Sequence, residues 1–242
     1  MTGPTITDIY EVIDTTWQPA SKTRHGPWMI REGRGAGGRV SSATAEAPVI
    51  DADIPIAEEA MRAFGQTPLF MIRDGETALD QALEARGYRI KDAVHAYAAP
   101  IGTLAADPPP VTCFEVWPPL EIMKEVWDAG GIGPERRAVM ARVPDPKTTI
   151  LGRTEDQPAG AAFVAIAGPF AMTHAVETLA RHRRRGLAVH MMQAAARWAA
   201  RHGATHMTLI TTQDNIAANA LYRSLGMTVI GGYHYRIHPE AP

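Results

Sequence analysis

The 242-residue sequence lacks three features that would each point to a class of protein. Its single cysteine, Cys113, excludes an internal disulfide and a cysteine-rich zinc site, which is typical of a reducing compartment. No apolar run approaches the roughly 18 residues that span a bilayer, and the amino terminus lacks the pattern of a signal peptide. The formal net charge is only −2. We therefore expect a cytoplasmic protein without a membrane or nucleic-acid partner.

The composition is that of a globular protein, with 45% hydrophobic and 21% charged residues. Its clearest break is Asp107-Pro108-Pro109-Pro110, because consecutive prolines donate no hydrogen bonds and favour an extended linker. The sequence thus predicts a first domain over 1–106, a linker over 107–110 and a second domain over 111–242. In the second domain strand and helix patterns alternate, which predicts a mixed α/β fold.

The segment Gly33-Arg34-Gly35-Ala36-Gly37-Gly38 has the GxGxxG spacing of dinucleotide-binding proteins. That motif holds a pyrophosphate only where its last glycine begins a helix, because the helix amides then face the anion. Here Arg39 to Thr44 follows and has the character of a strand. We interpret the segment as a glycine-rich hairpin turn.

A cluster of arginines precedes a helix that is expected over Gly186 to Arg201. It reads Arg181-His182-Arg183-Arg184-Arg185-Gly186-Leu187-Ala188. The first amides of a helix have no intrahelical partner and carry a partial positive charge. Gly186 and Ala188 leave room for a close approach of the ligand to the backbone. This arrangement favours the binding of a pyrophosphate over a solvated basic patch.

A second motif runs from Asn215 to Gly226, where Asn215 is placed to cap a helix and Tyr222 follows two turns later on the same face. Taken together, the two motifs resemble those of the GCN5-related N-acetyltransferase (GNAT) family. Arg183-x-x-Gly186-x-Ala188 is similar to the family's Q/R-x-x-G-x-G/A signature for acetyl-CoA. The segment Asn215 to Met227 is similar to its N-x-x-A…LY…LGF ending, with methionine in place of phenylalanine. The resemblance covers residues 111–242.

The resemblance implies the acyl-CoA acyltransferase fold of that family and acetyl-CoA as cosubstrate. The first half, with its Gly87-Tyr88 after a helix, looks like a degenerate copy of the same domain, which would make the chain a tandem protein. We expect this half to help form the substrate cleft or a homodimer face. The residues that the resemblance implies for acetyl-CoA binding are Val176, Glu177, Thr178, Arg183, Arg184, Arg185, Gly186, Leu187, Ala188 and Asn215.

The implied reaction is transfer of an acetyl group to a primary amine by direct attack in a ternary complex. An alkylammonium titrates near 10.4, so the amine needs a base. The candidates are His174 and Glu177, which strict alternation places on opposite faces of one strand unless a bulge intervenes, as is usual in the family. Bulk water or the substrate itself remains an alternative. The resemblance gives a backbone amide near Val176 or Glu177 to the oxyanion, and Tyr222 to the leaving thiolate as general acid.

Two other functions fit part of the sequence. A non-catalytic acyl-CoA sensor would keep the segment 183–188 without a base or Tyr222, and a nucleic-acid-binding module would use Arg181 to Arg185 against phosphates.

Acidic residues near a helix start in the first half either attract a cationic amine or interact with the helix dipole. These are Asp51, Asp53, Glu58 and Glu59. No signature identifies the acceptor.

Overall fold

The computed structural model describes residues 3–238 and residue 240. The helices are α1 (Ile6–Thr16), α2 (Ile54–Ala63), α3 (Thr77–Ala85), α4 (Ile101–Leu104), α5 (Glu121–Ala129), α6 (Pro134–Arg142), α7 (Leu187–Arg201) and α8 (Ile216–Ser224), with short 3₁₀ turns η1 (Gly38–Val40), η2 (Asp51–Asp53) and η3 (Ala180–His182). The strands are β1 (Ser21–His25), β2 (Trp28–Glu32), β3 (Thr44–Ala45), β4 (Leu69–Arg73), β5 (Arg89–Pro100), β6 (Cys113–Val116), β7 (Lys147–Thr154), β8 (Gln157–Ala167), β9 (Phe170–Thr178), β10 (His206–Thr212) and β11 (Thr228–Ile237). None of the helices in the described residues is both long enough and apolar enough to cross a membrane.

An eight-stranded mixed sheet extends through the whole protein in the order β4-β11-β5-β10-β9-β8-β7-β6. Most neighbours are antiparallel, whereas β9 and β10 are parallel. A second sheet, β1-β2-β3, belongs to the first half. The mixed α/β fold predicted from the sequence is confirmed.

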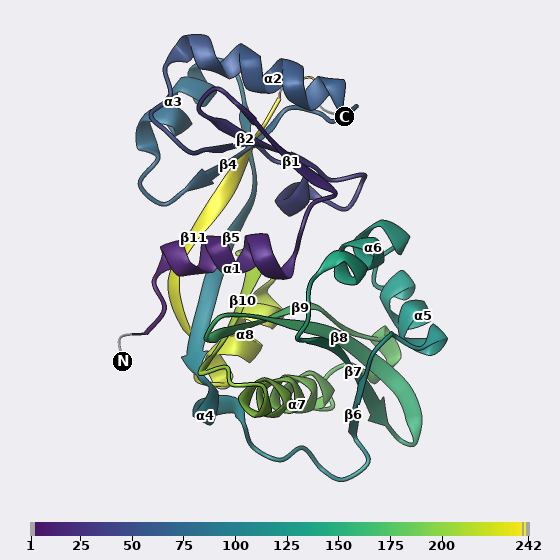
Figure 1. The fold of residues 1–242 in the computed structure, drawn as a ribbon. Helices are drawn as coiled ribbons and strands as arrows, with labels where there is room; N and C mark the ends of the chain where they lie inside the picture. The colour runs from purple at the N-terminus through teal and green to yellow at the C-terminus, as the bar shows by residue number, and fades with distance from the viewer. Residues whose placement is uncertain (1–2, 239, 241–242) are drawn as a thin grey trace.

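The two halves of the chain exchange their last strands. β5, from the first half, lies between β10 and β11, and β11, from the second half, lies between β4 and β5. Figure 1 shows both strands running from the lower to the upper part of the molecule. The residues of the proline linker lie between α4 and β6. The sheet is therefore continuous across the predicted domain boundary.

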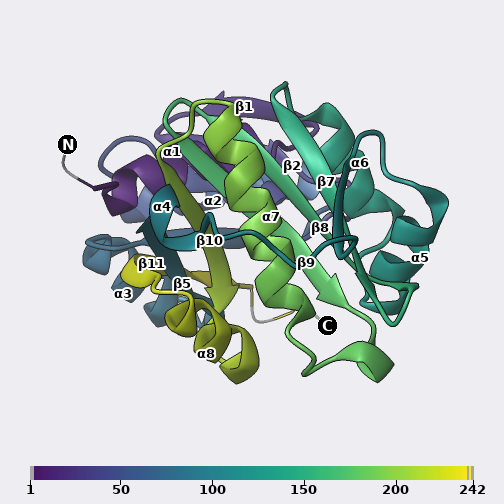
Figure 2. The same ribbon diagram turned by 90° about the horizontal axis from the view of Figure 1, so that it is seen from below.

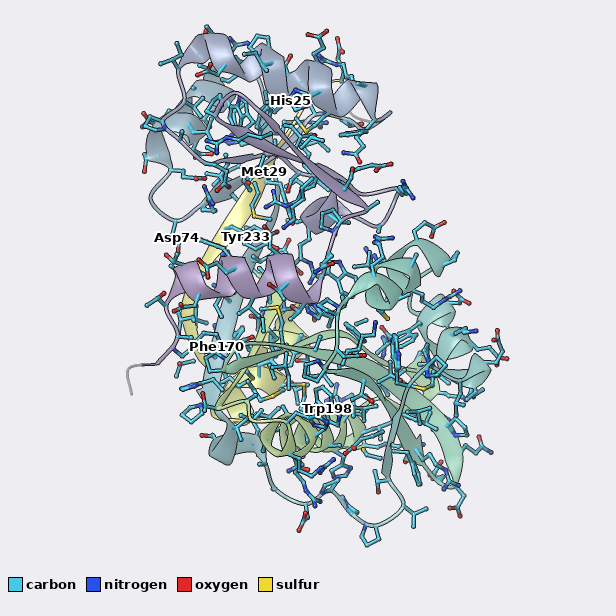
Figure 3. All side chains as sticks on the ribbon, viewed as in Figure 1. His25, Met29, Asp74, Phe170, Trp198 and Tyr233 are labelled. Carbon is cyan, nitrogen blue, oxygen red and sulfur yellow. The ribbon has the colours of Figure 1, made fainter. Side chains whose placement is uncertain are left out.

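Helices cover both faces of the sheet (Figures 1 and 2). α7 packs on one face, where Met191, Met192 and Trp198 belong to a buried cluster with residues of β8, β10 and α8. Trp198 is seen beneath the sheet in Figure 3. α1 and α5 cover the other face, and a separate core around Trp28 and Phe70 fills the upper part. The apolar faces of α1, α5 and α7 account for their places in the fold.

Local sequence signals set the start of two important helices. Thr5 caps α1 by accepting a hydrogen bond from the Asp8 amide, and the Asp8 carboxylate accepts one from the Thr5 amide. Before α7, Gly186 adopts φ 78°, a left-handed conformation in which glycine avoids the strain of a Cβ atom. The chain can thus turn sharply from η3 into α7.

The structure corrects our interpretation of the glycine-rich segment 33–38. The hairpin of this region is β1–β2, and Gly38 begins the 3₁₀ turn η1, not a strand. Gly35 and Gly37 have φ angles of 80° and 98°, which other residues rarely adopt. The segment is a loop between β2 and β3, and without an α-helix after it the pyrophosphate reading has no support. The sequence analysis also missed α6.

Candidate functional site

Strand β9 contains a bulge just before the predicted cofactor residues. Phe163 of β8 pairs with His174 and Ala161 pairs with Glu177, so β9 has one extra residue between these pairs. Ala175 has φ 51° at this point, and the Trp127 indole donates a 2.8 Å hydrogen bond to its carbonyl oxygen. The bulge expected on this strand is present. It changes the direction of the side chains that follow.

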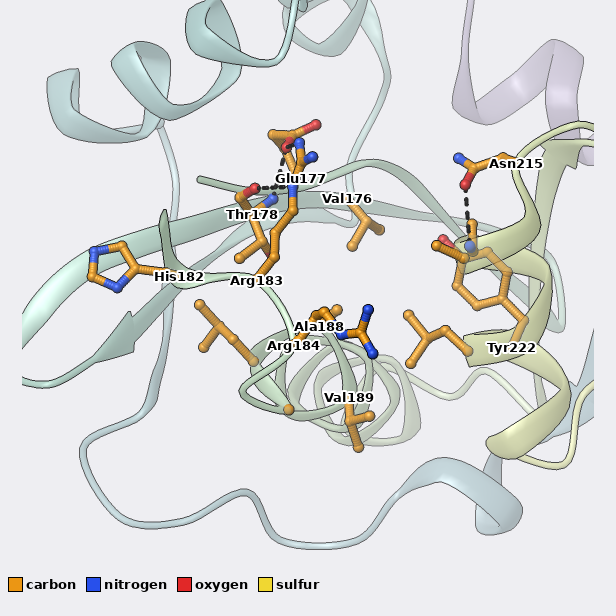
Figure 4. A pocket seen from close by; sticks show the side chains of 15 residues that line it. Val176, Glu177, Thr178, His182, Arg183, Arg184, Ala188, Val189, Asn215 and Tyr222 are labelled. Atoms are coloured by element: carbon orange, nitrogen blue, oxygen red, sulfur yellow. Dashed lines mark hydrogen bonds and ion pairs between the residues drawn. The ribbon is translucent and has the colours of Figure 1, made fainter. Parts of the chain in front are cut away.

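β9 and β10 separate shortly before the bulge. Their parallel pairing ends at Met172 and Thr208, so the later part of β9 has an edge without a strand partner. A cavity of about 430 Å³ lies at this opening, between β9, the start of α7 and the start of α8 (Figure 4). This volume is within the usual range for small-molecule sites.

The start of α7 presents backbone amides to the cavity. The first helical amide bond is donated by His190 to Gly186, and no capping side chain covers the amides of Leu187, Ala188 and Val189. Arg184 has φ 64°, and its side chain has no hydrogen-bond or ion-pair partner among the described residues. Figure 4 shows its guanidinium in the open centre of the cavity. Free amides, the helix dipole and this cation together suit an oxyanion such as a phosphate.

The neighbouring arginines differ from Arg184 because they have acidic partners. Arg183 forms a 3.0 Å ion pair with Glu177 and donates a hydrogen bond to the carbonyl oxygen of Thr178. Arg185 pairs with Glu155. Among the described residues that line the cavity, Arg184 thus lacks an acidic partner, while Arg183 stabilises the end of β9.

Tyr222 lines the same cavity from α8. Its side chain is buried, and loss of solvation is the main cause that raises its pKa to about 12. The phenol is therefore protonated at neutral pH and can donate a hydrogen bond. Asn215 starts α8 by accepting a 3.1 Å hydrogen bond from the Ala218 amide, as expected of a cap. Tyr222 and Val176 face each other across the opening in Figure 4.

Comparison with known proteins agrees with this geometry. Residues 112–227 match the model of the Acetyltransferase (GNAT) family. This region belongs to the GNAT family. The protein is an acyltransferase, and acyl-CoA is the donor that this family generally uses.

Proteins similar to this one match it over almost their whole length. The "Uncharacterized N-acetyltransferase YobR" of Bacillus subtilis is 23% identical, over 96% of this chain and 98% of the relative. A GCN5-related N-acetyltransferase from Kribbella flavida has a TM-score of 0.74 at 21% identity, covering 100% of this chain and 98% of that one. A tandem GNAT protein from the clavulanic acid biosynthesis pathway has a TM-score of 0.61 at 15% identity, covering 97% and 88%. The similarity in fold to these proteins therefore extends over almost the whole chain.

The GNAT cavity contains most of the residues that the sequence analysis proposed for the cofactor. Of those residues only Arg185 is absent from its lining. The sequence analysis missed others that line it, namely His182, Val189, Ala217, Ala218 and Leu221. Ala217, Ala218 and Leu221 lie within the Asn215 to Gly226 motif, and the spacing of α8 was the signal that would have identified them.

Both candidate bases are engaged by other residues, although Glu177 lines the cavity. Glu177 lies against Gly130, where an added Cβ would be 2.5 Å from Oε2, and its Oε1 accepts from Arg183 and from the Thr178 amide. His174 is buried on the opposite face of the sheet from α7, stacked on Trp17 at 4.8 Å between ring centroids. It does not line the 430 Å³ cavity.

The hydrogen bonds of His174 define its protonation state. Arg39 Nη1 lies 3.0 Å from Nδ1, and arginine can only donate, so Nδ1 accepts. Thr16 uses its hydroxyl hydrogen for the Val12 carbonyl oxygen, so its oxygen accepts from Nε2–H at 2.9 Å. Burial and then the charge of Arg39 lower the pKa of His174 well below 6.5. His174 is thus a neutral imidazole that holds Arg39.

A second cavity, of about 410 Å³, opens on the other side of the sheet. Residues of both halves form its walls. They are Trp17, Ala36, Gly37, Gly38, Arg39, Asp92, Val94, Arg136, Ile210, Thr211, Thr212, Asn215, Tyr233 and Tyr235. Asn215 lines both cavities, at the point where β9 and β10 have separated. Of these residues the sequence analysis proposed only Asn215 for the site.

The acidic residues considered for a cationic substrate lie away from both cavities. Asp51 is paired with Arg86 at 2.8 Å, and Glu58 with Arg62 at 3.3 Å. Glu58 also accepts a hydrogen bond from the Tyr88 hydroxyl. None of these acidic residues lines either cavity. The contacts of Asp51 and Glu58 indicate a structural role in the first half of the chain.

Proposed function

We propose that the protein transfers an acetyl group from acetyl-CoA to a primary amine by direct attack in a ternary complex. The observation that carries this proposal is one cavity that combines the open amides of α7, the unpaired edge of β9 and the Tyr222 phenol. A second cavity reaches the same junction at Asn215. Two substrates can therefore approach from opposite sides of the sheet and meet.

The cofactor is held mainly by backbone groups. The pyrophosphate binds to the amides of Leu187 to Val189 and to Arg184, where the helix dipole favours an anion. The amide groups of the pantetheine arm pair with the free edge of β9 over Val176 to Thr178, as an added strand would. The thioester then lies near the bulge, where an amide of Val176 or Glu177 donates to the oxyanion.

The reaction forms a C–N bond and breaks the C–S bond. The neutral amine attacks the thioester carbonyl, and the coenzyme A thiolate leaves with the electron pair of the C–S bond. Tyr222 donates a hydrogen bond to this sulfur. A thiol titrates near 8.5, below the Tyr222 phenol at about 12, so the hydrogen bond stabilises the thiolate and the final proton comes through the amine or water.

Deprotonation of the acceptor is assigned to water. The Nδ1 lone pair of His174 is occupied by Arg39, and the Oε1 atom of Glu177 is occupied by Arg183. In this proposal Glu177 positions Arg183 and the end of β9, and His174 positions Arg39. Of the bases considered from the sequence, the solvent alternative fits these contacts best.

Replacement of Tyr222 tests the mechanism. We expect Tyr222→Phe to lower kcat for thiol release from acetyl-CoA about 100-fold, because the thiolate loses its hydrogen-bond donor, while the acetyl-CoA dissociation constant stays the same. Thiol release against a panel of primary amines and calorimetric titration with acetyl-CoA measure the two quantities.

The matched control is Tyr97→Phe. Tyr97 packs against Tyr222 with ring centroids 5.7 Å apart, but its hydroxyl donates to Asn219 and does not line the cavity. This variant loses stability and keeps kcat. An unchanged kcat in Tyr222→Phe removes Tyr222 from the mechanism, and absence of acetyl-CoA binding to the wild type refutes the proposed function.

A further inference from the structure

We propose that the second cavity selects a small primary amine that also carries an anionic group, a carboxylate or a phosphate. This inference rests on the proposed function and names its acceptor class. The cavity lies opposite the acyl-CoA cavity and meets it at Asn215. Its volume of about 410 Å³ suits a small molecule.

Arg39 supplies the first cationic group of this cavity. Its guanidinium is half-buried, lies 5.1 Å from the Trp17 ring and donates to His174. No carboxylate forms an ion pair with it among the residues that the structure describes. A partly buried cation without a counter-ion is costly unless a ligand provides one. The chain of Thr16, His174 and Arg39 fixes the position of this cation in advance.

Arg136 supplies the second cationic group, from α6. It lies beside the glycine-rich loop: a Cβ atom added to Gly37 would be 3.6 Å from the Nη2 atom of Arg136. It has no ion-pair or hydrogen-bond partner in the described part of the chain. Arg137, the next residue, is in contrast paired with Asp128. Arg39 and Arg136 approach the cavity from different elements, which suits the several oxygens of a carboxylate or phosphate.

Asp92 gives the same cavity an opposite charge. It lies in a bulge of β5, where Val94 pairs with Tyr233 and Lys91 pairs with Tyr235, and it has φ 47°. Aspartate tolerates this conformation better than most residues, and a bulge redirects a side chain. Next to the bulge, Ala93 accepts a 2.8 Å hydrogen bond from the amide of Gln213, close to Asn215. Asp92 can therefore attract the ammonium end of the acceptor toward the junction.

The glycine-rich loop makes this arrangement possible. Gly38 packs so closely on Tyr235 that an added Cβ would lie 3.1 Å from the ring. Gly37, with φ 98°, turns the chain so that Arg39 reaches His174. The function of the GxGxxG-like segment is thus to form a wall of the acceptor cavity. Two cations against one carboxylate favour an acceptor with an anionic group over a polyamine.

The test compares four kinds of primary amine at fixed acetyl-CoA concentration. They are α-amino acids, phosphoethanolamine, neutral alkylamines and spermidine. We expect kcat/KM to be highest for one of the two anion-bearing classes, and the difference between amino acids and phosphoethanolamine identifies the anion. Calorimetric titration of the same compounds into the protein without acetyl-CoA gives a second readout that does not depend on turnover.

The variants separate a ligand contact from a structural effect. We expect Arg136→Gln to raise KM for the preferred acceptor about tenfold, as loss of a charge-assisted hydrogen bond implies, without changing KM for neutral amines. Arg34→Gln is the control, because Arg34 is an exposed arginine of the neighbouring glycine-rich loop, paired with Glu32 and outside the cavity. It leaves both KM values unchanged.

The outcomes distinguish the two proposals. Preference for spermidine or neutral amines, or equal KM values in Arg136→Gln and wild type, overturns the acceptor class while acetyl-CoA binding and turnover keep the proposed function. If acetyl-CoA binds and no amine is acetylated, the calorimetric titration of the amines tests the acceptor class. If neither of the two anionic amines binds, the inference is overturned. If acetyl-CoA itself does not bind, both proposals fail.

Discussion

At the scale of single residues, His174 is of a type that often acts as a catalytic base, but in this protein it holds Arg39 in place. The sequence suggests it as a base because it lies on the strand that leads to the cofactor loop. Its contacts with Arg39 and Thr16 come from segments more than 130 residues away in sequence, at separations of 135 and 158. No local pattern predicts such partners. Tyr222 and Gly186, by contrast, belong to short motifs with fixed spacing, and their place at the cavity could be predicted.

His174 should make stability depend on pH. Its pKa is lowered in the folded protein by burial and by Arg39, so the unfolded chain binds a proton first as the pH falls below about 6.5. The stability contributed by neutral His174 is present above that pH and is lost below it, at up to about 1.4 kcal/mol per pH unit. Urea unfolding at pH 7.5, 6.5 and 5.5 measures this loss.

The comparison variant is His174→Gln, which does not titrate in this range. We expect it to be less stable than the wild type at pH 7.5 and to show a shallower decrease toward pH 5.5. The eight other histidines are common to both proteins and cancel in the difference. Parallel decreases in the two proteins would show that His174 is not the source of the pH dependence.

At the scale of elements, the start of α7 and the bulge of β9 together define the acyl-CoA cavity. The start of α7 was predicted because Gly186 and Ala188 follow the arginines at the family's spacing. The bulge in β5 at Asp92 was not predicted, since strand sequences with one extra residue have no distinctive composition. Arg136 was missed for a similar reason, because α6 was not predicted and its apolar residues do not form a clear stripe.

Substitution of Gly186 tests the role of this helix start. Gly186→Ala forces alanine into a φ of 78°, which costs about 1 kcal/mol of stability and alters the amides that we propose bind the pyrophosphate. Gly203→Ala is the matched control, because Gly203 follows the other end of α7 with φ 86° and open space around it.

We expect both glycine variants to lose similar stability in chemical unfolding. Only Gly186→Ala should weaken acetyl-CoA binding, by about tenfold, when the two are titrated by calorimetry under the same conditions. Equal affinities in the two variants would mean that the amides of α7 do not contribute to binding.

At the scale of the whole molecule, the exchange of β5 and β11 is the main feature that the sequence does not reveal. The two strands follow Gly87 and Gly226 in the chain. Their order in the sheet depends on pairing between segments that are distant in sequence, and either strand would fit next to several others. Whether the first half is a degenerate GNAT-like domain stays a prediction.

The exchange predicts that the two halves fold only together. If a protease site is inserted between Pro109 and Pro110, cleavage should leave fragments 1–109 and 110–242 associated on size-exclusion chromatography, with acetyl-CoA binding retained. Expressed alone, each fragment exposes unpaired strand edges, which favour aggregation. A fragment 110–242 that is monomeric, unfolds cooperatively and binds acetyl-CoA with full affinity would contradict this prediction.

The acceptor cavity and the acyl-CoA cavity draw on different parts of the chain. All residues of the acyl-CoA cavity lie between Val176 and Tyr222, whereas the acceptor cavity also uses the loop at Gly37 to Arg39. Changes in that loop can therefore alter which amine is accepted without altering the donor site. The first half offers evolution, or a protein engineer, a means to change specificity while the acyl-transfer machinery is conserved.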